Sequence, residues 1–248
     1  MTMPSLRLGL GATGIYVAII ALATYYVFHI HDGPSQPQSM LIALLPIQMI
    51  AVLFCVGVVL RYTSWRAVGF GRLDWWGMVW FLPAWILLGW MGWHIVAGLA
   101  ADGMRAFGPF GLGVLIVTTF LIAFGEEVLF RGILLRGAVT RFSIPIAMLL
   151  STVLFGVFHF VNGLAGQGAV ETSQQVLFVM IVGVFLAPIA VRVGNLWPLI
   201  IWHWFWNMAV ILGQTAGLLH PLTLVGIAVQ AVVSIWLWTA MIRHHKLH

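Results

Sequence analysis

The sequence has 248 residues, of which 62% are apolar and 7% are charged, compared with about 45–50% and 25% in soluble domains. This composition excludes a soluble globular protein and predicts a multi-span membrane protein. The net charge of +5 is consistent with loops that face anionic lipid headgroups. No basic groove with exposed aromatic residues is evident, so we expect no nucleic-acid partner. The single cysteine, Cys55, excludes a disulfide framework or a cysteine metal cage within one chain.

Long apolar runs without alternation predict about eight transmembrane helices rather than barrel strands, because a spanning helix needs about 20 apolar residues. In chain order we expect spans at about residues 8–30, 40–60, 76–100, 109–142, 144–161, 172–191, 198–217 and 222–242. The connector after the second span carries arginines and tryptophans, as is typical of a membrane–water boundary. The fold class is therefore all-α, and we treat residues 1–248 as one integral-membrane domain.

The lysines and arginines fall almost entirely on one side of this topology. Cytoplasmic loops carry the excess of positive charge, so we expect both termini to be cytoplasmic in a multi-pass protein of a bacterial cytoplasmic membrane. Ten of the eleven basic residues lie on that side: Arg7, Arg61, Arg66, Arg72, Arg131, Arg136, Arg141, Arg192, Arg243 and Lys246. Arg105 is the exception.

Two adjacent carboxylates and an arginine interrupt the apolar fourth span, at Glu126, Glu127 and Arg131. Ionisable groups within a span are costly and usually face a protein interior or a water-filled cavity, so they indicate a functional site. Glu127 and Arg131 are four residues apart and can form an ion pair along the helix.

Three further polar side chains lie in apolar surroundings: His159 in the fifth span, and His203 with Asn207 in the seventh. Glu126 and His159 are equally distant from the turn at residues 142–143, so an antiparallel hairpin places them at equal depth. His203 and Asn207, four apart, share one helix face. Helical rise puts the first pair roughly 24 Å from the hairpin tip but His203 only about 10 Å from the start of its helix. The two pairs meet only if the tip projects beyond the membrane, so we expect a polar cavity in the cytoplasmic half that faces the cytoplasm.

This set of side chains permits peptide-bond hydrolysis without an acyl-enzyme. A carboxylate beside an imidazole can hold a water and remove its proton. A second imidazole and an amide can donate hydrogen bonds to the resulting oxyanion.

Other protease classes lack their expected patterns. No His-Glu-x-x-His string occurs, although zinc metalloproteases would show one. Ser151 lies about 12 Å along the helix from His159 by helical rise, and the three aspartates, Asp32, Asp74 and Asp102, fall in predicted loops. Two histidines and one or two glutamates could still hold a divalent ion such as zinc. Because the zinc-protease pattern is absent, we expect no cofactor. A zinc ion held by these histidines and glutamates is the alternative.

Three motifs in this order resemble the CPBP family of type II CAAX prenyl endopeptidases and bacteriocin-processing proteins: Glu126-Glu127-x-x-x-Arg131, Phe155-x-x-x-His159 and His203-x-x-x-Asn207. The sequence Gly194-Asn-Leu-Trp-Pro198 precedes the last one. The resemblance covers the helices of about residues 109–217.

The resemblance implies a glutamate-dependent intramembrane endopeptidase with eight helices. It implies that Glu126 and His159 activate the water, that His203 and Asn207 form the oxyanion hole, and that Glu127 and Arg131 support the site. The expected partners are the lipid bilayer and a peptide or protein substrate, prenylated or otherwise membrane-associated. A non-proteolytic immunity or binding role in this family is the alternative.

Overall fold

The computed structural model describes residues 2–30, 37–99, 108–215 and 219–245. Within these ranges all regular elements are helical, apart from one isolated bridge between Phe70 and Asn195. The long helices are α1 (Leu6–Tyr25), α2 (Pro37–Tyr62), α4 (Leu82–Leu99), α5 (Gly108–Glu126), α7 (Ile144–Phe158), α8 (Ala169–Val193), α9 (Trp197–Thr215) and α10 (Leu219–His245). Shorter segments adjoin them: η1 (Tyr26–Ile30), α3 (Trp75–Met78), η2 (Val79–Phe81), η4 (Glu127–Leu134), α6 (Leu135–Val139) and η5 (His159–Ala165).

Seven helical segments in the described part of the chain are long and apolar enough to cross a membrane. This confirms the predicted all-α, multi-pass fold. The predicted seventh span corresponds to α9, which is not among the seven. Its 19 residues give sufficient length, but four tryptophans together with His203 and Asn207 lower its mean hydropathy.

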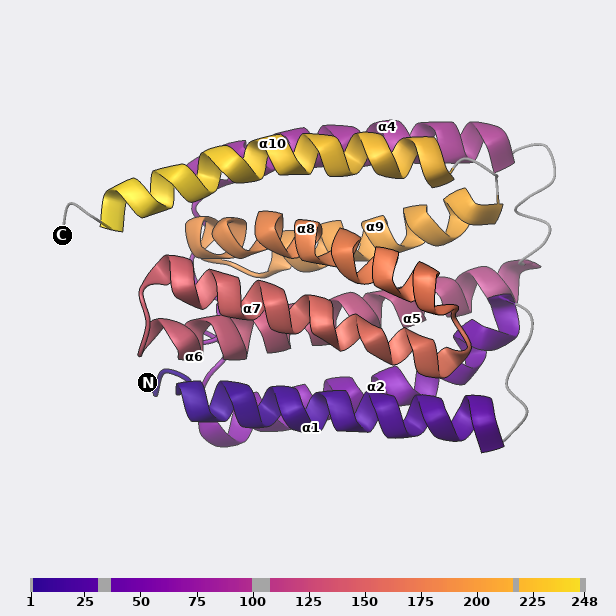
Figure 1. The fold of residues 1–248 in the computed structure, drawn as a ribbon, viewed down its shortest axis with the longest axis horizontal. Coiled ribbons are helices and arrows are strands. Elements are labelled where there is room, and N and C mark those ends of the chain that lie inside the picture. The colour runs from indigo at the N-terminus through magenta and orange to yellow at the C-terminus, as the bar shows by residue number, and fades with distance from the viewer. Residues whose placement is uncertain (1, 31–36, 100–107, 216–218, 246–248) are drawn as a thin grey trace.

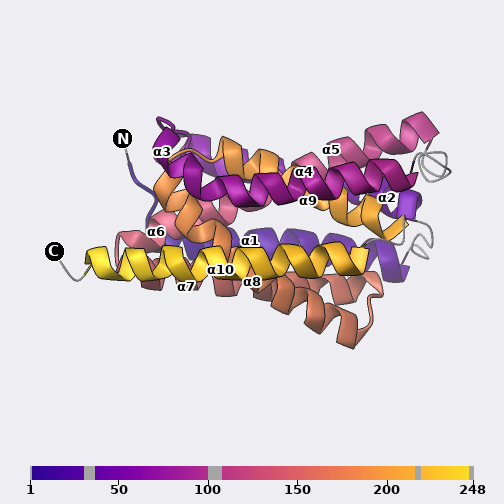
Figure 2. The same ribbon diagram turned by 90° about the horizontal axis from the view of Figure 1, so that it is seen from above.

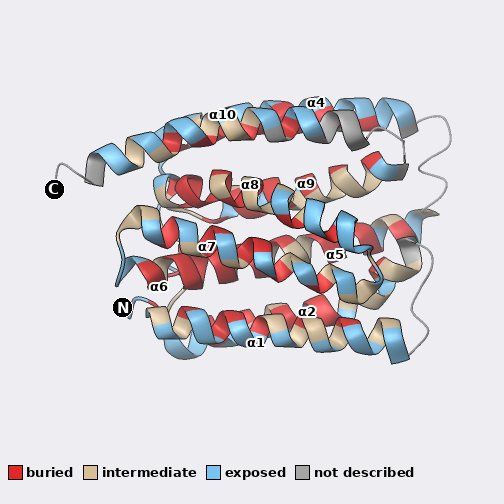
Figure 3. Cartoon of the chain, in the orientation of Figure 1, coloured by how far each residue is buried: buried red, intermediate tan, exposed pale blue. Residues whose placement is uncertain are grey.

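The helices run along the long axis of the molecule, and both described ends of the chain lie at the same end of the bundle (Figures 1 and 2). Contacts between α2 and α5, α5 and α9, α7 and α8, and α8 and α10 hold the bundle together. Buried positions concentrate on the central helices, whereas α1, α4 and α10 present exposed stripes (Figure 3). These stripes are apolar, with Leu22, Trp93 and Val232 among the most exposed side chains, as expected for surfaces in contact with lipid.

The basic connector predicted at the membrane boundary packs against the turn between α8 and α9. Leu196 N donates to Gly69 O at 2.9 Å, and Asn195 Nδ2 donates to Gly71 O at 2.6 Å. Asp74 N donates to Val193 O at 2.9 Å. Three hydrogen bonds therefore join segments about 120 residues apart in sequence and fasten the end of the bundle that carries the connector. The predicted Gly194–Pro198 turn thus has a structural role at this end.

Gly69 allows this junction to form. Its φ of +108° lies in a region that residues with a side chain rarely adopt. A Cβ at this position would lie 2.9 Å from Nε of Arg136. The arginine side chain therefore occupies the space beside the glycine, between the connector and α6.

Candidate functional site

The two adjacent glutamates lie where one continuous helix changes from α-helical to π-helical geometry. Residues Gly108–Val139 form a single spanning segment, within which α5 ends at Glu126 and the π-helical segment η4 begins at Glu127. Leu135 N donates to Phe130 O, a π-type bond. Every residue of η4 is buried. The predicted position of the motif inside a helix is confirmed, and its π-helical geometry, which is often found at functional sites, is an addition that the sequence did not indicate.

His203 of α9 lies between the two carboxylates. Its Nδ1 is 2.9 Å from Glu127 Oε1, and its Nε2 is 3.8 Å from Glu126 Oε2. The first distance is a hydrogen bond, whereas the second is too long for one. Since an ionised carboxylate only accepts hydrogen bonds, the ring nitrogen Nδ1 is the donor. Glu127 therefore fixes the orientation of the imidazole, and Glu126 is left close to its other nitrogen.

Arg131 stabilises the glutamate that holds His203. Its Nη1 donates to Glu127 Oε1 at 3.2 Å, and both side chains are 0% exposed. The guanidinium lies over the ring of Phe155, with Cζ 4.0 Å from the ring centroid, which is the geometry of a cation–π contact. The predicted pairing at a spacing of four residues is confirmed, and the carboxylate oxygen serves both Arg131 and His203.

His159 begins the 3-10 segment η5, immediately after α7 ends at Phe158. The fifth span was predicted to end at about residue 161, but η5 continues to Ala165. The Nδ1 atom lies 2.9 Å from the carbonyl oxygen of Phe155. A carbonyl only accepts hydrogen bonds, so Nδ1 carries the hydrogen and Nε2 of the neutral ring is an acceptor.

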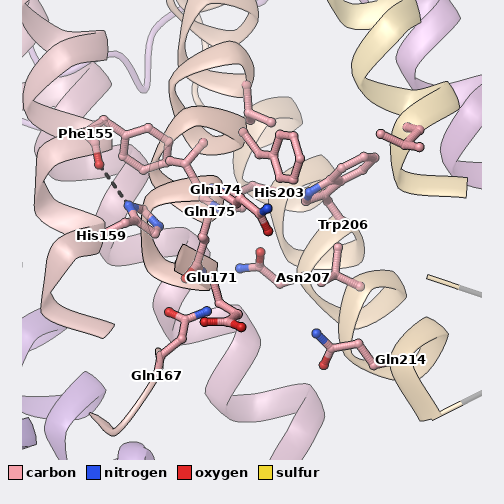
Figure 4. Close-up of a pocket in the computed structure, with 15 residues that line it drawn as sticks. Phe155, His159, Gln167, Glu171, Gln174, Gln175, His203, Trp206, Asn207 and Gln214 are labelled. Atoms are coloured by element: carbon pink, nitrogen blue, oxygen red, sulfur yellow. Dashed lines mark hydrogen bonds between the residues drawn. The ribbon is translucent and has the colours of Figure 1, made fainter. Parts of the chain in front are cut away.

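All four residues that the resemblance assigns to catalysis line one cavity of about 540 Å³: Glu126, His159, His203 and Asn207. A second lobe of about 560 Å³ shares His159, His203 and Asn207 and is drawn in Figure 4. Glu127 and Arg131 do not line either lobe. They lie behind His203, as their buried contacts require. Within the described residues, no protein group hydrogen-bonds Glu126 Oε2.

Several lining residues were given no role in the sequence analysis. The ring of Phe155 contacts Arg131 and both histidines, with centroid distances of 5.0 Å to His159 and 6.1 Å to His203. Amide side chains in and just before the first turns of α8 also line the second lobe (Figure 4), namely Gln167, Gln174 and Gln175. Adjacent glutamines inside a predicted apolar span were the available signal for this polar wall.

The other chemistries considered from the sequence can be compared with this geometry. Ser151 donates to the Phe130 carbonyl oxygen at 2.8 Å and so ties α7 to η4. Asp74 caps α3 by accepting from Trp76 N at 3.0 Å, whereas Asp32 and Asp102 lie outside the described residues. In the part of the chain that is described, no group of three or more His, Cys, Asp or Glu side chains is placed to hold a metal ion. The zinc alternative remains a hypothesis.

The cavity extends from Glu126 and His203 toward the end of the bundle where α2 and α8 begin. Its lining includes Thr24 and Phe28 near the end of the first span, Met40 of α2, and Gln167 just before α8. This end lies opposite the described chain ends and the turn between α6 and α7 (Figure 1). A cytoplasm-facing cavity and cytoplasmic termini were both predicted, and they are geometrically incompatible, because the two features lie at opposite ends.

The fold and the site define a multi-pass helical membrane protein in which buried carboxylates and imidazoles face an internal cavity. Residues 107–209 match the family described as Type II CAAX prenyl endopeptidase Rce1-like. This match confirms the resemblance indicated by the motifs, and the matched segment contains all six predicted site residues. No curated protein and no solved structure matches the chain.

Proposed function

We propose that this protein is an intramembrane endopeptidase that uses Glu126 and His159 to activate a water molecule. The observation that carries the proposal is the convergence of Glu126, His159, His203 and Asn207 on one cavity. The match of residues 107–209 to a family of prenyl endopeptidases supports the reaction class. The substrate is a peptide or protein that is membrane-associated, with or without a prenyl chain.

In the proposed reaction, a water lies between Glu126 and His159. The water donates one hydrogen to Glu126 Oε2, which no described protein group hydrogen-bonds, and the other to His159 Nε2, the acceptor nitrogen of a ring whose Nδ1 faces Phe155 O. Glu126 takes the proton as the water oxygen attacks the carbonyl carbon of the scissile bond. The proton then passes to the leaving amine as the C–N bond breaks, giving a carboxylic acid and an amine. General acid–base catalysis of this kind contributes about 10²–10⁴-fold in rate.

The opposite wall stabilises the oxyanion that forms during this attack. His203 Nε2 and Asn207 Nδ2 project from one face of α9 and act as the donors. Glu127 accepts from Nδ1 at 2.9 Å, which leaves Nε2 as the ring nitrogen that faces the oxyanion. Glu127 and Arg131 act through His203 and are positioning residues.

The test is cleavage of a peptide library by the purified full-length protein in detergent. Wild type, Glu126→Gln and His159→Ala are compared, with Gln48→Ala as a control that also lines the cavity. We expect both site variants to lose activity by about 10²-fold or more and the control to retain it. Activity in Glu126→Gln equal to that of wild type would refute the mechanism.

The same assay separates the alternatives. We expect a chelator to leave cleavage unchanged, whereas loss of cleavage that zinc restores would favour a metal-dependent mechanism. If wild type cleaves no peptide in the library or in membrane vesicles, the result favours the non-proteolytic immunity or binding role.

A further inference from the structure

We infer that substrates reach this site from the extracytoplasmic side of the membrane, so that the protein acts on exported or outward-facing polypeptides. This inference rests on the proposed function because it treats the ligand as a substrate. The side of the membrane on which the cavity opens does not depend on that function. It resolves the incompatibility between cytoplasmic termini and a cytoplasm-facing cavity in favour of the termini. Three observations support it: one end of the bundle is closed, the other is open, and the basic residues gather at the closed end.

The end near the described chain ends is closed by close packing. Between this end and the buried pair of Glu127 and Arg131, the side chains of Val68, Ile133 and Leu196 are all 0% exposed. The connector of residues 63–74 is hydrogen-bonded across the turn between α8 and α9. A Cβ at Gly137 of α6 would lie 2.5 Å from Ser5 O, and one at Gly132 would lie 2.9 Å from Val68 O. Backbone therefore packs directly on backbone, and a polypeptide has no path through this layer.

The opposite end carries the mouth of the cavity. Gln174 and Gln214 are exposed and line the second lobe together with Glu171. All three are drawn around the cavity in Figure 4, where Gln214 lies well away from Phe155. Gln174 and Glu171 belong to the first two turns of α8. Amide side chains both donate and accept hydrogen bonds, which suits the backbone of an extended peptide passing between them.

The charge distribution assigns the two ends to the two sides of the membrane. Eight described arginines lie toward the closed end, at residues 7, 61, 66, 72, 136, 141, 192 and 243. Glu171 lies at the open end, and the described residues that line the mouth include no lysine or arginine. Arg105 and Lys246, which were counted in the sequence, lie outside the described residues. Because positive charge is retained on the cytoplasmic side, the closed end is cytoplasmic and the mouth is extracytoplasmic.

This assignment changes the substrate class. The carboxyl terminus of a soluble cytoplasmic protein would meet the closed end, whereas an exported peptide, a secreted precursor or an outward-facing loop would meet the mouth. Each lobe, at about 540–560 Å³, is within the range of about 300–1,000 Å³ typical of ligand pockets. The cavity thus accommodates a short extended segment rather than a folded domain.

Labelling of introduced cysteines tests the orientation. The full-length protein is expressed in intact bacterial cells as Gln174→Cys at the mouth and as Phe142→Cys, which is exposed at the α6–α7 turn. The native Cys55 is 0% exposed, so wild type gives the background. With a membrane-impermeant maleimide, we expect labelling of Gln174→Cys in intact cells and labelling of Phe142→Cys only after permeabilisation. The reverse pattern, or equal labelling of both in intact cells, would overturn the inference.

A third variant tests the path to the site. Val210 lines both lobes and takes no part in the proposed chemistry. We expect Val210→Cys to be labelled from outside intact cells, and Ile133→Cys, in the closed layer, to remain unlabelled. Labelling of Val210→Cys only from the cytoplasmic side would also overturn the inference. These readouts do not depend on proteolysis, so a failure of the endopeptidase proposal in the Glu126→Gln comparison is distinguishable from a failure of this one.

Discussion

His203 and Glu127 are joined by a 2.9 Å contact between Nδ1 and Oε1, and the same carboxylate oxygen accepts from Arg131 at 3.2 Å. All three side chains are buried. The contact therefore links the helix that carries the predicted oxyanion donors to the helix that carries the predicted base. In the proposed mechanism, Glu127 therefore acts on the reaction by orienting His203.

Replacing Glu127 by methionine separates stability from catalysis. We expect Glu127→Met to lower the free energy of unfolding by about 3–5 kcal/mol, because Arg131 is left as an uncompensated buried charge. The double variant Glu127→Met/Arg131→Met replaces the ion pair by apolar side chains and should regain much of this stability. It should remain catalytically impaired, mainly in kcat, because His203 has lost its acceptor. Thermal unfolding in detergent and steady-state cleavage measure the two effects, and recovery of kcat in the double variant would contradict a positioning role for Glu127.

Phe155 is expected to be the most sensitive apolar residue of the site. Its ring is 1% exposed and packs on Arg131, His159 and His203. We expect Phe155→Ala to reduce the free energy of unfolding by about 3–5 kcal/mol, as for other buried aromatic residues. Phe160→Ala is the matched control, since Phe160 is 52% exposed and should change stability by no more than about 0.5 kcal/mol. Equal losses in the two variants would show that the ring contacts of Phe155 do not stabilise the site.

Much of this arrangement could be predicted from the sequence because helical geometry is regular. The constant rise along a helix placed Glu126 and His159 at one depth, and both line the same cavity. The spacing of four residues identified the pair of Glu127 and Arg131. The α6–α7 turn extends past the α8–α9 turn in Figures 1 and 2, whereas the projection of this tip beyond the membrane stays a prediction.

Other features depend on packing that periodicity does not encode. The π-helical geometry of η4 affects which side chains face the cavity, and the spacing of residues 127–134 alone does not indicate it. The role of Phe155 depends on three partners from three different elements. The direction of the cavity could not follow from depths alone, because distances along an axis do not indicate which end is filled by Val68 and Leu196 and which end is lined by Gln174.

The junction that closes the bundle near the described chain ends should depend on Gly69. A side chain there meets a φ of +108° and a Cβ position 2.9 Å from Arg136 Nε. We expect Gly69→Ala to cost about 1–3 kcal/mol in the free energy of unfolding because of backbone strain. Gly89→Ala in α4 is the control: a Cβ at Gly89 meets nothing within 4 Å, and alanine is favoured over glycine in a helix by about 0.5–1 kcal/mol. Thermal unfolding of both variants checks the prediction, which a stabilised Gly69→Ala would contradict.

Asn207 is expected to act on the transition state rather than on substrate binding. It lines both lobes beside His203 on the same face of α9, and an amide that stabilises an oxyanion makes its strongest contact only after the water has attacked. Removal of one such donor costs about 10²–10³-fold in kcat, so we expect Asn207→Ala to lower kcat by this factor with little change in KM. Gln214→Ala, about two turns further along α9 at the mouth, should instead affect KM. Steady-state kinetics on a cleaved peptide distinguish the two, and an increase in KM alone for Asn207→Ala would assign Asn207 to substrate binding.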